Sequence, residues 1–116
     1  MGRWEVMTVA KIKKSEKPDV EVQQILDVLA KYGRNHKKAQ IDVRRRHAVS
    51  IRIRIIDPDF RGLNRVEREP EVLKLLKKLP DEVYADITML LLLTPEEAPH
   101  SFANLEFENP IPSPPI

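Results

Sequence analysis

Hydrophobic and polar residues alternate along residues 50–56 with a period of two. The apolar side of this stretch is Ile51, Ile53 and Ile55, and the polar side is Arg52 and Arg54. Such alternation is typical of a β-strand that buries one face. A second alternating stretch covers residues 40–46, and only a short link separates the two. The pattern therefore predicts a β-hairpin.

Two stretches outside this hairpin carry apolar residues at the spacing of an amphipathic helix. The first covers residues 19–32, with Asp19 placed as its N-cap and Gly33 placed to end it in the left-handed conformation. The second starts at Pro70, because proline suits the first position of a helix, and stops at Pro80. We therefore expect one helix before the hairpin and one after it.

The chain beyond the second helix is predicted to form a strand, a short helix and an extended piece. Residues 83–93 are assigned to a third strand, whose continuous apolar end at 89–93 indicates burial on both faces or contact with a partner. Thr94 and Glu97 have the spacing of a capping box, which would open a very short helix. Residues 101–108 are expected to be extended.

These elements follow the order α-β-β-α-β with a short terminal helix. The predicted fold is α+β with two layers, a three-stranded mixed sheet and helices on one of its faces. The other face would carry four arginines, Arg44, Arg46, Arg52 and Arg54. A chain of 116 residues fits one such domain, which we place at residues 18–108. A flexible arm would precede it at residues 1–17, and a proline-rich, disordered tail would follow at residues 109–116.

The composition restricts the chemistry that this chain can perform. The chain has no cysteine, which excludes disulfides, thiolate metal sites and cysteine nucleophiles. No apolar run approaches the roughly 18 residues of a membrane span. The first residues lack the apolar core of a signal peptide. We therefore expect a soluble, cytoplasmic protein that has no membrane partner.

Positive charge is concentrated in the first 68 residues, which hold 17 Lys and Arg against 9 Asp and Glu, whereas the remainder holds 3 against 9. Guanidinium groups bind phosphates in a bidentate manner, so the arginines are a candidate surface for phosphate, nucleic acid or an acidic partner. The candidates are Arg44, Arg46, Arg52, Arg54, Arg61, Arg65 and Arg68. The alternative is a solvated face whose arginines pair with acids such as Asp42 on a neighbouring strand. The chain lacks a GXXG loop and has few aromatic residues on which bases could stack.

Several short motifs follow one another in the second half of the chain. They are Phe60-x-Gly62, Arg68 six residues later, a leucine-rich helix, Val83-Tyr84-Ala85, and Thr94-Pro95-Glu96-Glu97. Their order and spacing resemble the BolA family, over residues 20–98 as a whole and with recognisable motifs over residues 50–98. The resemblance implies a BolA-type fold, which is similar to the class II KH arrangement and agrees with the order of elements above.

The resemblance also draws attention to the residue after Arg68, where the family has a histidine and this chain has Glu69. In the family this histidine binds a [2Fe–2S] cluster that is shared with a monothiol glutaredoxin. A second ligand often comes from the loop between the first two strands, which holds His47 here. A glutaredoxin partner would therefore have to use Glu69 and His47, although a carboxylate is a harder donor than an imidazole.

Other side chains with chemical potential lack a specific pattern. Asp57 and Asp59 could serve as a metal or acid/base pair, or simply stabilise the turn around Pro58. The three histidines, His36, His47 and His100, lack metal-ligand spacing and are expected on the surface. The sequence contains no P-loop and no dinucleotide-binding fingerprint.

The function predicted from the sequence is that of a small adaptor or regulatory protein that acts through surface contacts. It is not expected to be an enzyme or to hold a cofactor. The apolar run at 89–93 and residues 101–107 would lie near a sheet edge, and would either form a homodimer or protein-partner contact or be covered by the C-terminal segment. The alternatives are a nucleic-acid-binding module and an iron–sulfur partner of a glutaredoxin.

Overall fold

The computed structural model describes residues 19–110. The predicted arm at residues 1–17 and most of the predicted tail therefore lie outside the described residues. The helices and strands are α1 (Val20–Asn35), β1 (Gln40–His47), β2 (Ser50–Ile56), the 3₁₀ helix η3 (Pro58–Phe60), α2 (Arg65–Leu76), α3 (Asp81–Ala85), β3 (Ile87–Leu93), the 3₁₀ helix η4 (Ala98–His100) and α4 (Phe102–Glu108).

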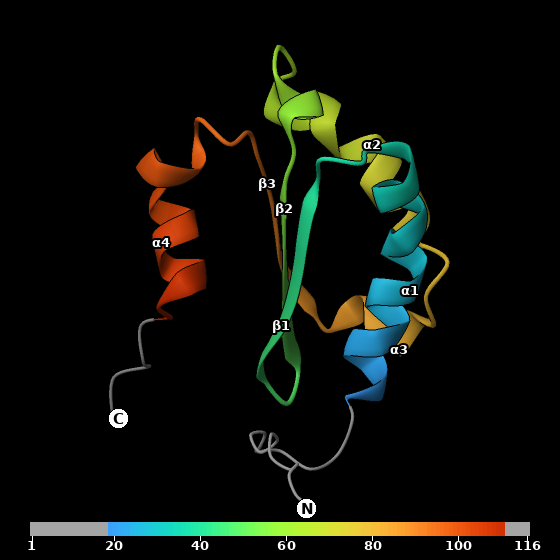
Figure 1. The fold of residues 1–116 in the computed structure, drawn as a ribbon. Coiled ribbons are helices and arrows are strands. Elements are labelled where there is room, and N and C mark those ends of the chain that lie inside the picture. The colour runs from blue at the N-terminus through green and yellow to red at the C-terminus, as the bar shows by residue number, and fades with distance from the viewer. Residues whose placement is uncertain (1–18, 111–116) are drawn as a thin grey trace, which may run out of the picture.

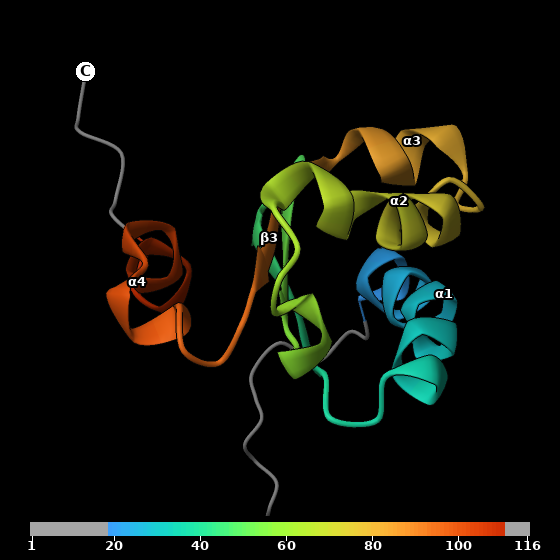
Figure 2. The same ribbon diagram turned by 90° about the horizontal axis from the view of Figure 1, so that it is seen from above.

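A three-stranded mixed sheet forms the centre of the protein, with the strand order β1-β2-β3. β1 and β2 are antiparallel, which confirms the predicted hairpin. β3 is parallel to β2, and no other strand of residues 19–110 pairs with its outer side. The predicted α+β fold is confirmed. Figure 1 shows α1, α2 and α3 on one face of the sheet, while Figure 2 shows that α4 lies on the opposite face.

The hydrophobic core lies between the sheet and the helices α1 and α2. The three isoleucines of β2 that face the helices, Ile51, Ile53 and Ile55, are fully buried. They pack in one cluster with Ile25 and Leu29 of α1 and with Val72 and Leu76 of α2. The period-two pattern thus identified the buried face of the central strand correctly.

Two predicted helix ends are wrong, the C-terminus of α1 at Gly33 and the N-terminus of α2 at Pro70. In both helices, contacts with neighbouring residues outweigh the preference of that residue for a helix end. Gly33 does not end α1; the helix continues to Asn35, and a β-carbon at Gly33 would lie 3.6 Å from Ile41, so α1 packs closely on β1 there. Pro70 does not begin α2, since a capping box between Asn64 and Glu67 starts the helix earlier. Pro70 instead lies inside the helix.

Two segments that were predicted to be extended are helical. The first part of 83–93 belongs to α3, whose first turn contains Asp81 and Glu82, acids that suit a helix N-terminus. Residues 101–108 form α4, because the Ser101 side chain accepts a hydrogen bond from the Asn104 amide and caps the helix. The expected hydrogen bonds between Thr94 and Glu97 are present, at 3.0 and 3.1 Å, ahead of η4.

The helix α4 covers the sheet face that carries the arginines. Its Phe107 is 1% exposed and lies between the guanidinium groups of Arg44 and Arg54, at 4.7 and 4.6 Å from the ring centre. Arg52 donates to Glu106 at 2.6 Å. The arginine face that the sequence left uncovered is therefore the contact surface for the C-terminal helix.

Phe107 should contribute most of the energy that holds α4 on the sheet. We expect Phe107→Ala to lower the free energy of unfolding by about 3 kcal/mol, since it removes a buried aromatic ring. The matched control is Phe102→Ala on the same helix, which is 89% exposed and should change stability by less than about 0.5 kcal/mol. Urea denaturation measures both, and equal losses would contradict this placement of α4.

Candidate functional site

The arginines of the sheet face already have partners inside the protein. Arg54 is 3% exposed, donates to Asp42 on β1 at 2.8 Å and to Asn104 on α4 at 2.8 Å, and forms an ion pair with Glu108. These contacts match the alternative in which cross-strand acids pair with the arginines. Arg44 is partly exposed and Arg46 is half-buried on β1.

The remaining candidate arginines lie near the start of α2 and serve different roles. Arg68 is nearly buried and donates to the carbonyl oxygens of Leu63 and Leu92 at 2.9 and 3.0 Å. Arg61 forms an exposed ion pair with Glu96. Arg65 is exposed on α2. The seven arginines therefore do not form one continuous basic surface.

The residues that carry the family resemblance form a structural joint between α2 and the end of β3. The guanidinium of Arg68 lies 5.6 Å from the centre of the Phe60 ring and pairs with Glu97 at 2.7 Å. This hydrogen bond is the main reason that the pKa of Glu97 falls to about 2. Gly62 has a φ of 82°, a conformation that glycine adopts without strain.

His47 and Glu69 are not brought together. His47 is exposed at the turn between β1 and β2, whereas Glu69 is on α2, which starts beyond the other end of β2 (Figure 1). Because ligands of one cluster must lie within a few ångströms of each other, these two side chains cannot act as the pair of ligands that the resemblance suggested.

A groove with a volume of about 640 Å³ runs along the open edge of β3. One wall comes from the start of α2 and the other from the segment that leads into α4. The lining residues are Leu63, Asn64, Arg65, Arg68, Glu69, Leu90, Leu91, Leu92, Leu93, Glu96, Glu97, His100 and Ser101. A smaller hollow of about 260 Å³ follows the same strand toward its start and includes Leu73, Tyr84 and Leu90.

The backbone of β3 alternates between bonding to β2 and facing the groove. The carbonyl of Leu93 accepts from the Asp57 amide at 2.9 Å, so it points toward β2. The carbonyl of Leu92 points the other way and accepts from Arg68 instead. By the same alternation the amide and carbonyl of Leu90 face the groove. Among residues 19–110, no strand pairs with this side of β3, whose backbone groups lie among apolar side chains.

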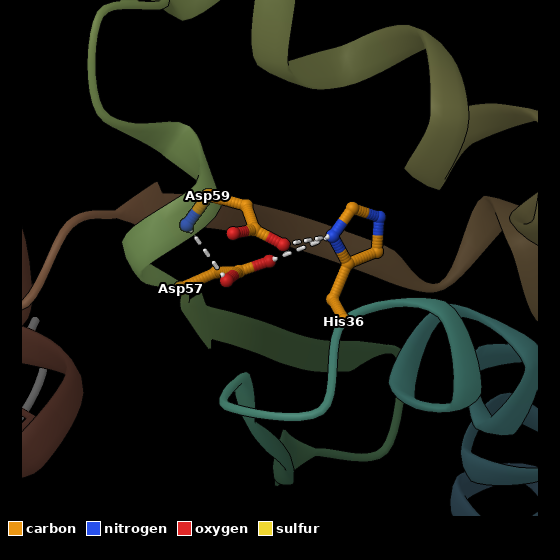
Figure 3. A group of neighbouring side chains, drawn as sticks. All are labelled: His36, Asp57 and Asp59. Carbon is orange, nitrogen blue, oxygen red and sulfur yellow. Dashed lines mark hydrogen bonds and ion pairs between the residues drawn. The ribbon is translucent and has the colours of Figure 1, made fainter.

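A second cluster joins α1, the end of β2 and α2 around His36, and Figure 3 shows its central side chains. His36 Nδ1 lies 2.7 Å from an oxygen of Asp59 and 3.4 Å from an oxygen of Asp57. His36 Nε2 lies 2.8 and 2.9 Å from the two oxygens of Glu71. The Tyr32 ring stacks on the imidazole with 4.1 Å between centres.

The electrostatics of this cluster favour a positive charge on His36. Carboxylates only accept hydrogen bonds, so an imidazole with carboxylates at both nitrogens is satisfied when both nitrogens are protonated. Burial by itself lowers the pKa of His36, but the hydrogen bonds to Asp59 and Glu71 outweigh it and raise the pKa above its usual value. Burial and the hydrogen bond to Asp57 also raise the pKa of Tyr32, so its hydroxyl remains a donor.

No spacing of residues in the sequence indicates this cluster. His36 was expected on the surface, yet its side chain is 18% exposed. Asp57 and Asp59 were recognised as a turn with a metal or acid/base alternative, and Asp57 does accept from the Asp59 amide as turn chemistry requires. Their histidine partner lies more than twenty residues earlier in the chain, so only the packing of α1 against the end of β2 brings the groups together.

Comparison of the chain with protein-family models, with curated proteins and with solved structures finds no match. The BolA resemblance therefore stays a prediction from the sequence. Among residues 19–110, no helix has both the length and the apolar character needed to span a membrane.

The raised pKa of His36 makes a prediction about stability. In the unfolded chain a histidine has a pKa of about 6.5, and below this pH the charged His36 contributes its full stabilisation to the folded state. This stabilisation is lost as the pH rises through the higher pKa that His36 has in the folded protein. We expect His36→Gln to cost about 1.5–3 kcal/mol at low pH, typical of a hydrogen bond to a charged group, and less in alkaline buffer. Denaturation across a pH series measures this, with the exposed His47→Gln as the control. A pH-independent cost would contradict the charged state.

Proposed function

We infer that this protein is a small non-enzymatic adaptor that binds an extended segment of a partner protein along the open edge of β3. The observation that carries the proposal is the outward-facing backbone of Leu90, which lines the groove and pairs with no strand in the described part of the chain. Strand addition to an exposed sheet edge is a common mode of peptide recognition, in which the main chain supplies affinity and alternate side chains supply specificity. The resemblance to the BolA family supports the same class of function.

The chemistry of the groove defines the partner that it fits. Leu90 and Leu91 line the groove from opposite faces of β3, while Leu63 and Val66 at the start of α2 are exposed. Arg65 and Glu69 line or border the groove and make no ion pair with another described residue. A strand with alternating apolar residues, flanked by one basic and one acidic side chain, would complement these features.

The test is to select extended peptides against the full chain from a random library and to map the tightest one by amide chemical shifts and hydrogen exchange. We expect shifts along residues 87–93 and at Leu63, and slower exchange of the Leu90 amide. Leu90→Pro should abolish binding, because proline removes the amide that faces the groove without removing a bond to β2. Circular dichroism checks that this variant remains folded.

Two further variants keep the test decisive if Leu90→Pro is unstable. Glu69→Arg reverses one charge of the groove and should weaken a basic-flanked peptide at least tenfold, as expected for a loss of about 1.4 kcal/mol. Val49→Lys, at the exposed β1–β2 turn, should leave binding unchanged. Peptides that map to α4, or affinities insensitive to Glu69→Arg and Leu90→Pro, would overturn the proposal.

The alternatives have less support. Nucleic-acid binding through the sheet face would require Glu106 and Glu108 to leave Arg52 and Arg54, so binding to oligonucleotides with a steep salt dependence would be the evidence in its favour. A glutaredoxin partner would require ligands other than the His47 and Glu69 pair. A homodimer through β3 uses the same edge as the proposed partner, and sedimentation of the free protein separates the two.

A further inference from the structure

We propose that His36, Asp57 and Asp59 bind a divalent transition-metal ion of the zinc type. The His36 ring nitrogen Nδ1 and one carboxylate oxygen from each aspartate lie within 4.8 Å of one another. Imidazole nitrogen and carboxylate oxygen are usual ligands of zinc in proteins. None of these residues lines the groove on β3, so the proposal is independent of the adaptor function.

The distances from His36 to the two aspartates are close to those that a bound ion requires. Ligands at about 2.0–2.1 Å in a tetrahedral arrangement lie roughly 3.3 Å apart. His36 Nδ1 already lies 3.4 Å from Asp57 Oδ2, whereas it lies only 2.7 Å from Asp59 Oδ2. Asp59 would therefore move outward by roughly 0.6 Å. Its side chain is 61% exposed, which permits this movement and leaves room for water to complete the coordination.

Neighbouring groups form hydrogen bonds to two of the proposed ligands, His36 and Asp57, and orient them as the surroundings of a metal site usually do. Figure 3 shows both carboxylates directed at the same nitrogen of His36. A carboxylate on the far nitrogen of a histidine fixes the ring and its tautomer, and Glu71 lies 2.8 Å from Nε2. Asp57 is fully buried, and its two oxygens accept from the Asp59 amide and the Tyr32 hydroxyl at 2.9 and 2.6 Å. Two of the three ligands are therefore fixed in place before any ion binds.

The charge of the cluster gives the physical reason for a cation at this position. Three carboxylates surround one imidazole, so the group is negative even when His36 is protonated. A neutral imidazole would direct the lone pair of Nδ1 at two carboxylates, which is repulsive. Either a proton or a metal ion must lie between them. A divalent ion supplies more positive charge than a proton at the same position.

The experiment titrates the full chain with zinc ions near neutral pH by calorimetry, in two buffers with different ionisation enthalpies. We expect one zinc ion per chain and a net release of protons on binding, because the ion takes the place of the proton on Nδ1. Asp59→Asn, which alters an exposed side chain, should weaken binding at least tenfold, and His36→Gln should abolish it. His47→Gln and His100→Gln are the matched controls and should bind as the unaltered chain does.

A second readout separates a metal site from a merely structural histidine. Glu71→Gln does not remove a ligand, so it should keep the stoichiometry of one while weakening zinc affinity by roughly 10–100-fold. Cobalt ions should give visible absorption bands with the unaltered chain and not with His36→Gln. Absence of saturable binding at millimolar zinc, or affinity unchanged in Asp59→Asn, would overturn the proposal and leave His36 as a protonated structural residue.

Discussion

Arg54 lies on the central strand of the sheet, and its charged side chain is almost fully buried. The surrounding structure must therefore supply partners for this charge. A buried charge without a partner costs several kcal/mol, so the chain has to bring acceptors to it. Asp42 comes from the neighbouring strand, while Asn104 and Glu108 come from α4, some fifty residues later. The ring of Phe107 covers the same guanidinium. The contacts of this buried cation therefore act together with the buried ring of Phe107 to hold the C-terminal helix on the sheet.

With both faces of the sheet covered, the outer sides of its two edge strands, β1 and β3, are the parts that no other described strand joins. The helices α1 and α2 cover one face and α4 covers the other, but no element of the described part of the chain pairs with the outer edge of β3. Arg68 blocks one end of that edge by taking the carbonyl of Leu92, and its ion pair with Glu97 fixes the segment that leads into α4. The motif residues of the BolA resemblance therefore shape one end of the groove.

The cluster around His36 connects the elements at the other side of the core. The end of α1, the end of β2 and the middle of α2 meet there through one imidazole and three carboxylates. Tyr32 ties the buried Asp57 to α1 and stacks on the histidine. The same contacts that stabilise this junction when His36 is protonated are the ones that would coordinate a metal ion, so stability and ion binding are coupled through a single proton.

The sequence by itself determined the elements whose signals are local. The alternating isoleucines defined β2 and its buried face, Asp19 caps α1 as predicted, and Thr94 and Glu97 form the hydrogen bonds that their spacing indicated, in the turn before η4. The helix ends predicted at Gly33 and Pro70 were wrong. Gly33 lies inside α1 where the helix packs on β1, and the capping box of Asn64 and Glu67 starts α2 before Pro70. Only the tertiary structure decided that acids of α4 would pair with the arginines and that His36 would meet Asp57 and Asp59. These contacts join residues more than twenty positions apart, and no spacing in the sequence encodes which distant side chains share a site.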